Sequence, residues 1–145
     1  TTNLTDMYKM FTGCSSLVTA NLSSFVTSKV TDMSYLFQNC SKLQTVDMRN
    51  IGSTAITSTG NYQYMLSGCL ALTTLYWGMK TAPSVYTNTF GSNSSTFTGY
   101  TNRRRGTNKL YLPTGHSGYT TSGNSNYWRT RLQSTSYCGF TITTY

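Results

Sequence analysis

The sequence predicts an α/β repeat solenoid, a fold built by stacking one short unit on the next. Residues 6–22 are nearly repeated at residues 32–48, which lie 26 positions later, and a looser third copy follows at a spacing of 29. Each copy changes from a helix-like to a strand-like spacing of apolar residues. A repeat period of this length indicates a stacked array, because one such unit cannot bury its apolar side alone.

The first half of each unit is predicted to be a short helix or helical turn. In the segment 30–37, apolar residues stand at positions i, i+3, i+6 and i+7, which is the spacing of one helix face. Thr31 is suited to cap this helix, and the carboxylate of Asp32 suits its positive end.

The second half of each unit is predicted to be a short strand. In "LQTVDM", Leu43, Val46 and Met48 follow the L-x-x-L-x-L pattern of a leucine-rich-repeat strand. These three side chains should point into the core, because side chains alternate across a strand. We expect the following residues of the second copy to point inward: Met33, Leu36, Phe37, Cys40, Leu43, Val46 and Met48.

The cysteines are predicted to form a column through the stack. Cys14, Cys40, Cys69 and Cys138 are isolated, with none of the paired spacings of a metal site. Buried free thiols are the favoured interpretation, and disulfides between neighbouring copies are the alternative.

Residues 7–33, "MYKMFTGCSSLVTANLSSFVTSKVTDM", resemble the unit of the BspA-type leucine-rich repeats of bacterial surface proteins. The resemblance is strong through residue 56 and weaker to about residue 80. The segments 110–119, 127–132 and 140–143 are similar to the closing unit of that family. We therefore expect a single leucine-rich-repeat domain over residues 1–145, divided as follows: repeats at about 4–29, 30–55 and 56–80, a degenerate repeat with a loop insertion at 81–112, and a C-terminal cap at 113–145.

The charge of the chain restricts its partners. Of 145 residues, 10% are charged, and the net charge of +8 comes from 11 Lys and Arg against 3 acids. This charge attracts acidic partners at long range. The basic residues are scattered apart from Arg103 to Arg105, without the interleaved aromatics of nucleic-acid binders, so a nucleic-acid partner is disfavoured. No apolar stretch reaches the roughly 18 residues of a membrane span, and we expect none in this chain.

Catalytic chemistry finds little support in the sequence. His116 is the only histidine, and all three acids lie in the first third of the chain. A catalytic base would need a nucleophile and an orienting acid beside it. We therefore expect no enzymatic activity, no metal and no cofactor, and a hydrolase built around His116 is kept as an alternative.

The resemblance implies a cell-surface or secreted bacterial module for adhesion or host interaction. We expect non-enzymatic recognition of a protein or glycan, an acidic one among the options, through the outward side of the strands. The alternative is a self-associating structural subunit of a phage or cell-surface fibre, which would place the chain in a virion or on a cell. The candidate partner-binding residues lie on the strands and in the arginine loop: Asn21, Asp47, Arg49, Tyr76, Tyr111, Arg103, Arg104 and Arg105.

Overall fold

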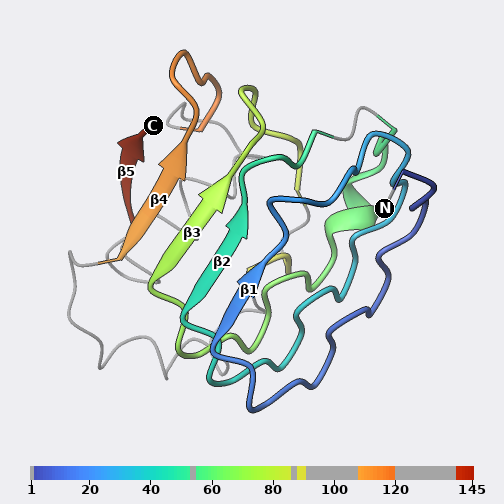
Figure 1. Cartoon of the computed structure of the whole chain (residues 1–145), viewed down its shortest axis with the longest axis vertical. Coiled ribbons are helices and arrows are strands. Elements are labelled where there is room, and N and C mark those ends of the chain that lie inside the picture. The colour runs from blue at the N-terminus through green and yellow to red at the C-terminus, as the bar shows by residue number, and fades with distance from the viewer. Residues whose placement is uncertain (1, 53–54, 86–87, 91–107, 120–139) are drawn as a thin grey trace.

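Five short strands form one parallel sheet in chain order (Figure 1). The computed structural model describes residues 2–52, 55–85, 88–90, 108–119 and 140–145. The strands are β1 (Thr19–Asn21), β2 (Thr45–Met48), β3 (Thr74–Trp77), β4 (Lys109–Leu112) and β5 (Thr141–Thr144). Each strand pairs with the next one along the chain, so each connection leads the chain back to start the neighbouring strand.

The register of the sheet follows the spacing of the repeats. Ala20 pairs with Val46 and Val46 pairs with Leu75, so the paired residues are those at equivalent positions of successive copies. The row continues through Leu110 to Ile142 on the last two strands. Because neighbouring strands lie about 4.8 Å apart, equivalent side chains of successive copies stand in straight rows.

The core lies between the sheet and the segments that connect its strands. Val46, Leu75 and Leu110 on the inner side of the sheet are fully buried, and Trp77 fills the layer beside them. All seven inward positions predicted for the second copy are at most 1% exposed, so that prediction is confirmed. The first copy is less well covered, since Leu17, the equivalent of the fully buried Leu43, is only half-buried.

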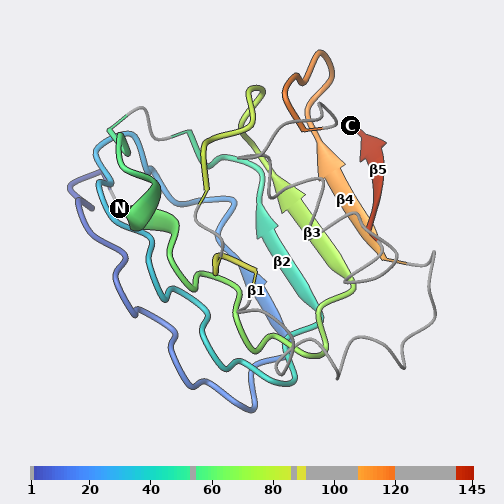
Figure 2. The same cartoon turned by 180° about the vertical axis from the view of Figure 1, so that it is seen from behind.

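The helical turn expected in each repeat is absent, and the α/β repeat solenoid is therefore the wrong fold class. Residues 34–39 form a run of turns instead. Figure 2 shows this segment and its equivalent in the first copy as irregular tubes, without a helical ribbon, beside the sheet. In the part of the chain that the structure describes, the one helical element is the 3₁₀ helix η1 (Thr59–Tyr62). Over the described residues, the chain is nearly helix-free and is folded around a single parallel sheet.

Hydrogen bonding between copies explains why the helix does not form. In the second copy, the backbone N–H groups of Met33, Tyr35 and Phe37 donate to carbonyls of the third copy at 2.8 to 2.9 Å. An α-helix would use these donors inside its own segment, and a helix of two turns is marginal by itself. Pairing with the next copy satisfies the same groups and joins the copies together.

The turns also reproduce the apolar spacing that predicted a helix. Leu36 N–H donates to the Met33 carbonyl, three residues back, so the segment returns to the same side about as often as a helix face does. This run of turns places two left-handed residues in each copy. The first are Lys9, Tyr35 and Tyr64, with φ of 56°, 60° and 54°, and the second are Gly13, Asn39 and Gly68. Each of these residues other than glycine costs about 1 to 2 kcal/mol, which the stacking of the Tyr35 and Tyr64 rings, with centroids 5.1 Å apart, helps to offset.

Candidate functional site

The solvent side of the sheet carries two rows of polar side chains. Asn21, Asp47, Tyr76 and Tyr111 are in register on β1 to β4, and we call them the strand-face row. Their neighbours in sequence point into the core, so the alternation of a strand directs these four outward. The second row, two residues earlier on each strand, runs through Thr19, Thr45, Thr74, Lys109 and Thr141.

Asp47 and Arg49 form an ion pair at the centre of the strand-face row. Arg49 Nη2 lies 2.6 Å from Asp47 Oδ2, and Nε lies 3.0 Å from both carboxylate oxygens. The pair is anchored because the backbone N–H of Arg49 also donates to Asp47 Oδ1 at 3.2 Å. Hydrogen bonding to the Asp47 carboxylate raises the pKa of the Arg49 guanidinium, while the Arg49 side chain stays 47% exposed and within reach of a partner.

Tyr76 and Tyr111 form a stacked aromatic pair next to this ion pair. Their ring centroids lie 4.4 Å apart with the planes 15° from parallel. The Arg49 guanidinium carbon lies 5.0 Å from the Tyr76 ring centroid, which is within cation–π range. Both tyrosines are half-buried. The three side chains hold one another in place, so little side-chain entropy is left to lose on binding a partner.

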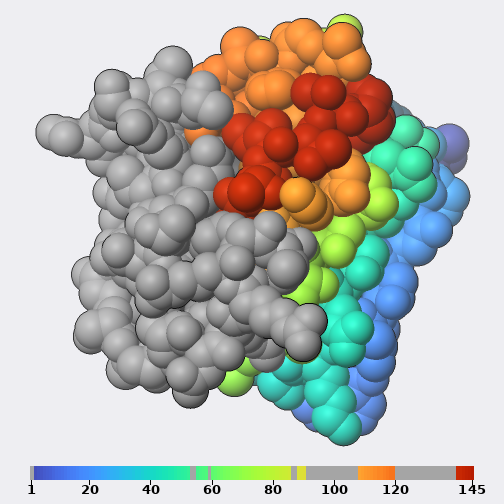
Figure 3. Space-filling view, turned by 90° about the vertical axis from the view of Figure 1, so that its left-hand side faces the viewer, coloured from blue at the N-terminus to red at the C-terminus, as the bar shows by residue number. Residues whose placement is uncertain are grey.

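Tyr145 extends this cluster from the end of the chain. Its ring centroid lies 6.5 Å from that of Tyr76, and its hydroxyl donates to the Trp77 carbonyl at 3.3 Å. Partial burial raises the pKa of the Tyr145 hydroxyl. Tyr145 nevertheless remains 44% exposed. Figure 3 shows the last segment, residues 140–145, lying beside residues 108–119, with the earlier copies following as adjacent bands.

The structure brings together part of the predicted site. Asp47, Arg49, Tyr76 and Tyr111 form one cluster. Asn21 is in register, but its Oδ1 accepts hydrogen bonds from the backbone N–H and hydroxyl of Ser23, at 2.9 and 2.7 Å, so it is engaged locally. The predicted Arg103, Arg104 and Arg105 lie outside the described residues.

Tyr145 and Lys109 also lie at this surface, although the sequence pattern did not predict them there. Lys109 Nζ donates to Thr141 Oγ1 at 3.1 Å and crosses from β4 to β5. The signal for Lys109 was present in its position, two residues before Tyr111 on the same strand. No repeat pattern reaches Tyr145, because its place beside Tyr76 depends on how β5 pairs with β4.

The three carboxylates of the chain are all engaged in local interactions. Asp6 and Asp32 each accept the backbone N–H two residues ahead, from Tyr8 at 2.6 Å and Ser34 at 2.7 Å. Such turns stabilise the backbone where the helix caps were expected. With Asp47 paired to Arg49, each acid has a structural role.

The described cysteines stand in a column of thiols. Cys40 Sγ donates to the Phe11 carbonyl at 3.0 Å, and Cys69 Sγ donates to the Phe37 carbonyl at 3.1 Å, each reaching back to the preceding copy. Burial raises the pKa of both thiols. Cys14, the first of the column, is exposed, and Cys138 lies outside the described residues.

The described residues form neither a metal-binding cluster nor a membrane-spanning helix. These residues contain no group of three or more His, Cys, Asp or Glu side chains placed to hold a metal ion. None of their helices has the length and apolar character needed to cross a bilayer.

Comparison with known proteins gives one match. Residues 1–98 match the family described as "Mycoplasma protein of unknown function, DUF285". No curated protein and no solved structure matches the chain.

Proposed function

We propose that this chain, which belongs to the DUF285 family, is a non-enzymatic recognition module that binds a protein or glycan through the strand face of its sheet. The observation that carries the proposal is the cluster of Arg49, Tyr76 and Tyr111 on the solvent side. Tyrosine and arginine are the residue types that most often dominate binding energy at interfaces. Here they are pre-ordered by mutual stacking and still reachable from solvent.

A surface or secreted location is part of the same proposal. The DUF285 family is related to BspA-like surface repeat proteins, and the near match of residues 7–33 to the BspA-type unit supports the finer assignment. The net charge of +8 favours acidic partners through long-range attraction. The engagement of all three carboxylates in local contacts supports a role without acid–base catalysis.

A binding array tests the strand face. Wild-type protein, Arg49→Ala and Tyr111→Ala would be applied to immobilised acidic and neutral glycans and to cell-surface proteins. Tyr8→Ala is the matched control, since Tyr8 is an exposed tyrosine on the first copy, away from the strand-face row. We expect a ligand whose affinity falls at least about tenfold in both test variants and is unchanged in the control.

Two results would contradict the proposal. One is the absence of any saturable ligand on the array. The other is an equal loss of affinity in the control and test variants, which would indicate that binding does not use the strand face. Thermal unfolding of each variant separates a lost contact from a lost fold.

A structural subunit of a fibre is the second candidate, and a specific feature favours it. Tyr8, Met10, Val18 and Val26, which are 40 to 47% exposed, all belong to the first copy. Met10 is the equivalent of Leu36 in the second copy. Leu36 is fully buried because the first copy packs beside it, whereas Met10 is 40% exposed. Among the described strands, β1 pairs only with β2 and forms an edge of the sheet. An edge strand is a template for pairing with another chain.

Light scattering across a concentration series tests this second role. Self-association that Val18→Lys abolishes would support a fibre subunit, since a charge at that edge blocks pairing. A monomer at every concentration would exclude it and leave recognition as the proposed function.

A further inference from the structure

The first two cysteines of the column occupy equivalent positions on neighbouring copies. Just before them the two backbones pair in parallel, where Gly13 N–H donates to the Gln38 carbonyl at 2.7 Å. Figure 1 shows these two segments running side by side. Hydrogen-bonded neighbouring chains lie about 4.8 Å apart, which sets the separation of the Cys14 and Cys40 Cα atoms. A disulfide needs about 4.4 to 6.8 Å between its Cα atoms, so the backbone spacing permits one here.

The thiol of Cys40 is directed at Cys14. Cys40 Sγ donates to the Phe11 carbonyl at 3.0 Å, and the backbone N–H of Cys14 donates to the same carbonyl at 3.2 Å. The third copy repeats the arrangement, because the Phe37 carbonyl accepts both Cys69 Sγ and the Cys40 N–H at 3.1 Å. Each of these thiols therefore reaches back to the backbone of the preceding cysteine.

Accessibility separates Cys14 from the other two described thiols. Cys14 is exposed, whereas Cys40 and Cys69 are 0% exposed. Burial raises the pKa of the Cys40 thiol, and a thiol reacts as its thiolate, so Cys40 is a poor first target for a reagent in solution. The first copy is the outermost one of the described stack, and outer elements open at a lower free energy than the core. A reagent therefore meets Cys14 first, and Cys40 is reached through Cys14.

We propose that Cys14 is a modification site for small disulfides, and that Cys40 converts the product into a bond between the first two copies. The Cys14 thiolate attacks the external disulfide, which forms a mixed disulfide on Cys14 and releases one thiolate. The Cys40 sulfur then attacks Cys14 Sγ, so that the Sγ–Sγ bond forms, the mixed disulfide breaks, and the second thiol leaves with the Cys40 proton. The two protein thiols are oxidised, and the external disulfide is reduced to two thiols. The site shares no residue with the strand-face row and is independent of binding there.

Tryptic mapping of the whole chain after incubation with oxidised glutathione tests the proposal. Trypsin cuts after lysine and arginine, which places each of the four cysteines in a peptide of its own, with Cys14 in 10–29 and Cys40 in 30–42. We expect these two peptides to be linked in the native protein. The yield should not change on dilution, because the second step is intramolecular. Protein unfolded in urea is the control and should give mixed pairs, since the fold no longer selects the partner.

Variants separate the two steps. Cys40→Ala keeps the first step and loses the second, so the glutathione adduct on Cys14 should accumulate. Cys14→Ser, at an exposed position, should keep the fold and leave Cys40 and Cys69 unmodified. Cys69→Ala is the matched control from the next copy and should form the same link as the wild type.

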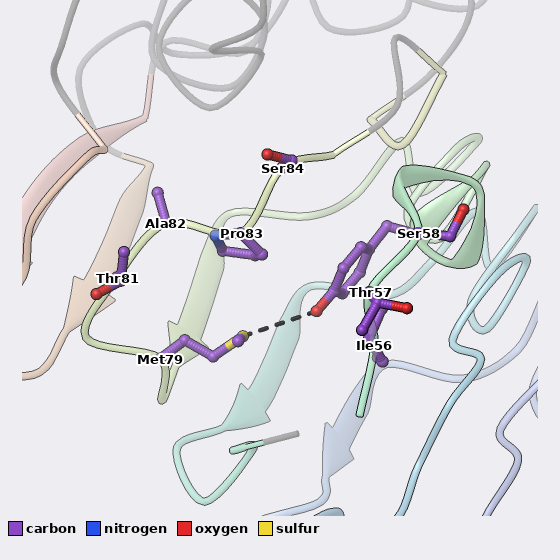
Figure 4. Close-up of a pocket in the computed structure, with 9 residues that line it drawn as sticks. Ile56, Thr57, Ser58, Met79, Thr81, Ala82, Pro83 and Ser84 are labelled. Carbon is purple, nitrogen blue, oxygen red and sulfur yellow. Dashed lines mark hydrogen bonds between the residues drawn. The ribbon is translucent and has the colours of Figure 1, made fainter. Parts of the chain in front are cut away.

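The sulfur of Met79 reports on the kind of oxidation. Met79 lines a pocket of about 390 Å³ with residues 56–58 and Tyr62 on the opposite wall (Figure 4). Its Sδ accepts a hydrogen bond from the Tyr62 hydroxyl at 3.8 Å, drawn as the dashed line. A thioether takes up oxygen from a peroxide but has no proton to lose in exchange with a disulfide. Met79 should therefore keep its mass, and an added oxygen there would contradict thiol exchange as the source of the link.

Three results would overturn the proposal. One is a glutathione adduct that persists on Cys14 of the native wild type. Another is a link whose yield falls on dilution, which would join the Cys14 residues of two chains. The third is a link between Cys40 and Cys69 instead of Cys14. None of these results alters the array test of the strand face.

Discussion

Replacing Gly13 with alanine should destabilise this protein, although the same change inside a helix would stabilise it. Gly13 has φ of 74°, a left-handed conformation that costs an alanine about 1 to 2 kcal/mol. In a helix, alanine is favoured over glycine by about 1 kcal/mol. A Cβ at Gly13 would meet nothing within 4 Å, so the backbone conformation alone sets the sign of the effect.

The equivalent glycine of the third copy adds a steric term. Gly68 has φ of 77°, and a Cβ there would contact Asn39 Oδ1 and lie 3.1 Å from the Asn39 Cα. Because backbone atoms of a stacked neighbour cannot easily move, Gly68→Ala should cost about 1 to 3 kcal/mol more than Gly13→Ala. Asn39 itself occupies the same position in the second copy with φ of 61°, so Asn39→Gly should be neutral within about 0.5 kcal/mol.

Urea and thermal unfolding measure the three variants. Gly13→Ala should lower Tm by about 4 to 8 °C, if 1 kcal/mol corresponds to about 4 °C for a chain of this size. A rise in Tm for Gly13→Ala would refute the turn structure and restore the helix. Equal losses in Gly13→Ala and Gly68→Ala would refute the close packing of neighbouring copies at Asn39.

Three other outcomes are expected. Gly78→Ala should strongly destabilise the protein and displace Arg49, because a Cβ there would overlap the Arg49 carbonyl. Nuclear magnetic resonance of the arginine side chain would detect the displacement, and a wild-type spectrum would contradict it. Iodoacetamide should label Cys14 in the native state and Cys69 only after unfolding, since Cys14 is exposed and Cys69 is fully buried. Peptide mass mapping would identify the labelled cysteines, and native labelling of both would place the column outside the core. Burial raises the pKa of Tyr62 from 10.0 to about 12. The free energy of unfolding that the neutral Tyr62 hydroxyl contributes is therefore complete below about pH 10 and is lost as the pH rises to 12. The alkaline fall in Tm should be shallower in Tyr62→Phe, and an unchanged slope would contradict the burial.

The candidate site was predictable where it follows the repeat. Asp47 and Tyr76 occupy equivalent positions of successive copies, and that equivalence alone placed them in one row of a parallel sheet. Arg49 was predictable as a neighbour of Asp47, but its position over the Tyr76 ring depends on side-chain packing between two strands. The pocket under Tyr62 could not be predicted, because it lies between two connecting segments that follow no shared pattern.

The sequence by itself determined the copies, their stacking order and their inward side chains, since a repeated apolar pattern has one efficient way to be buried. Only the tertiary structure decided the backbone conformation of the first half of each copy. The apolar spacing of 30–37 fits a helix and a run of turns equally well, because both return to the same side of the segment at a similar interval. The choice depends on where the backbone N–H groups find their acceptors, and for Met33, Tyr35 and Phe37 those acceptors lie in the next copy. An acceptor in another copy is invisible to any local pattern, and it is this acceptor that replaces the helix with turns.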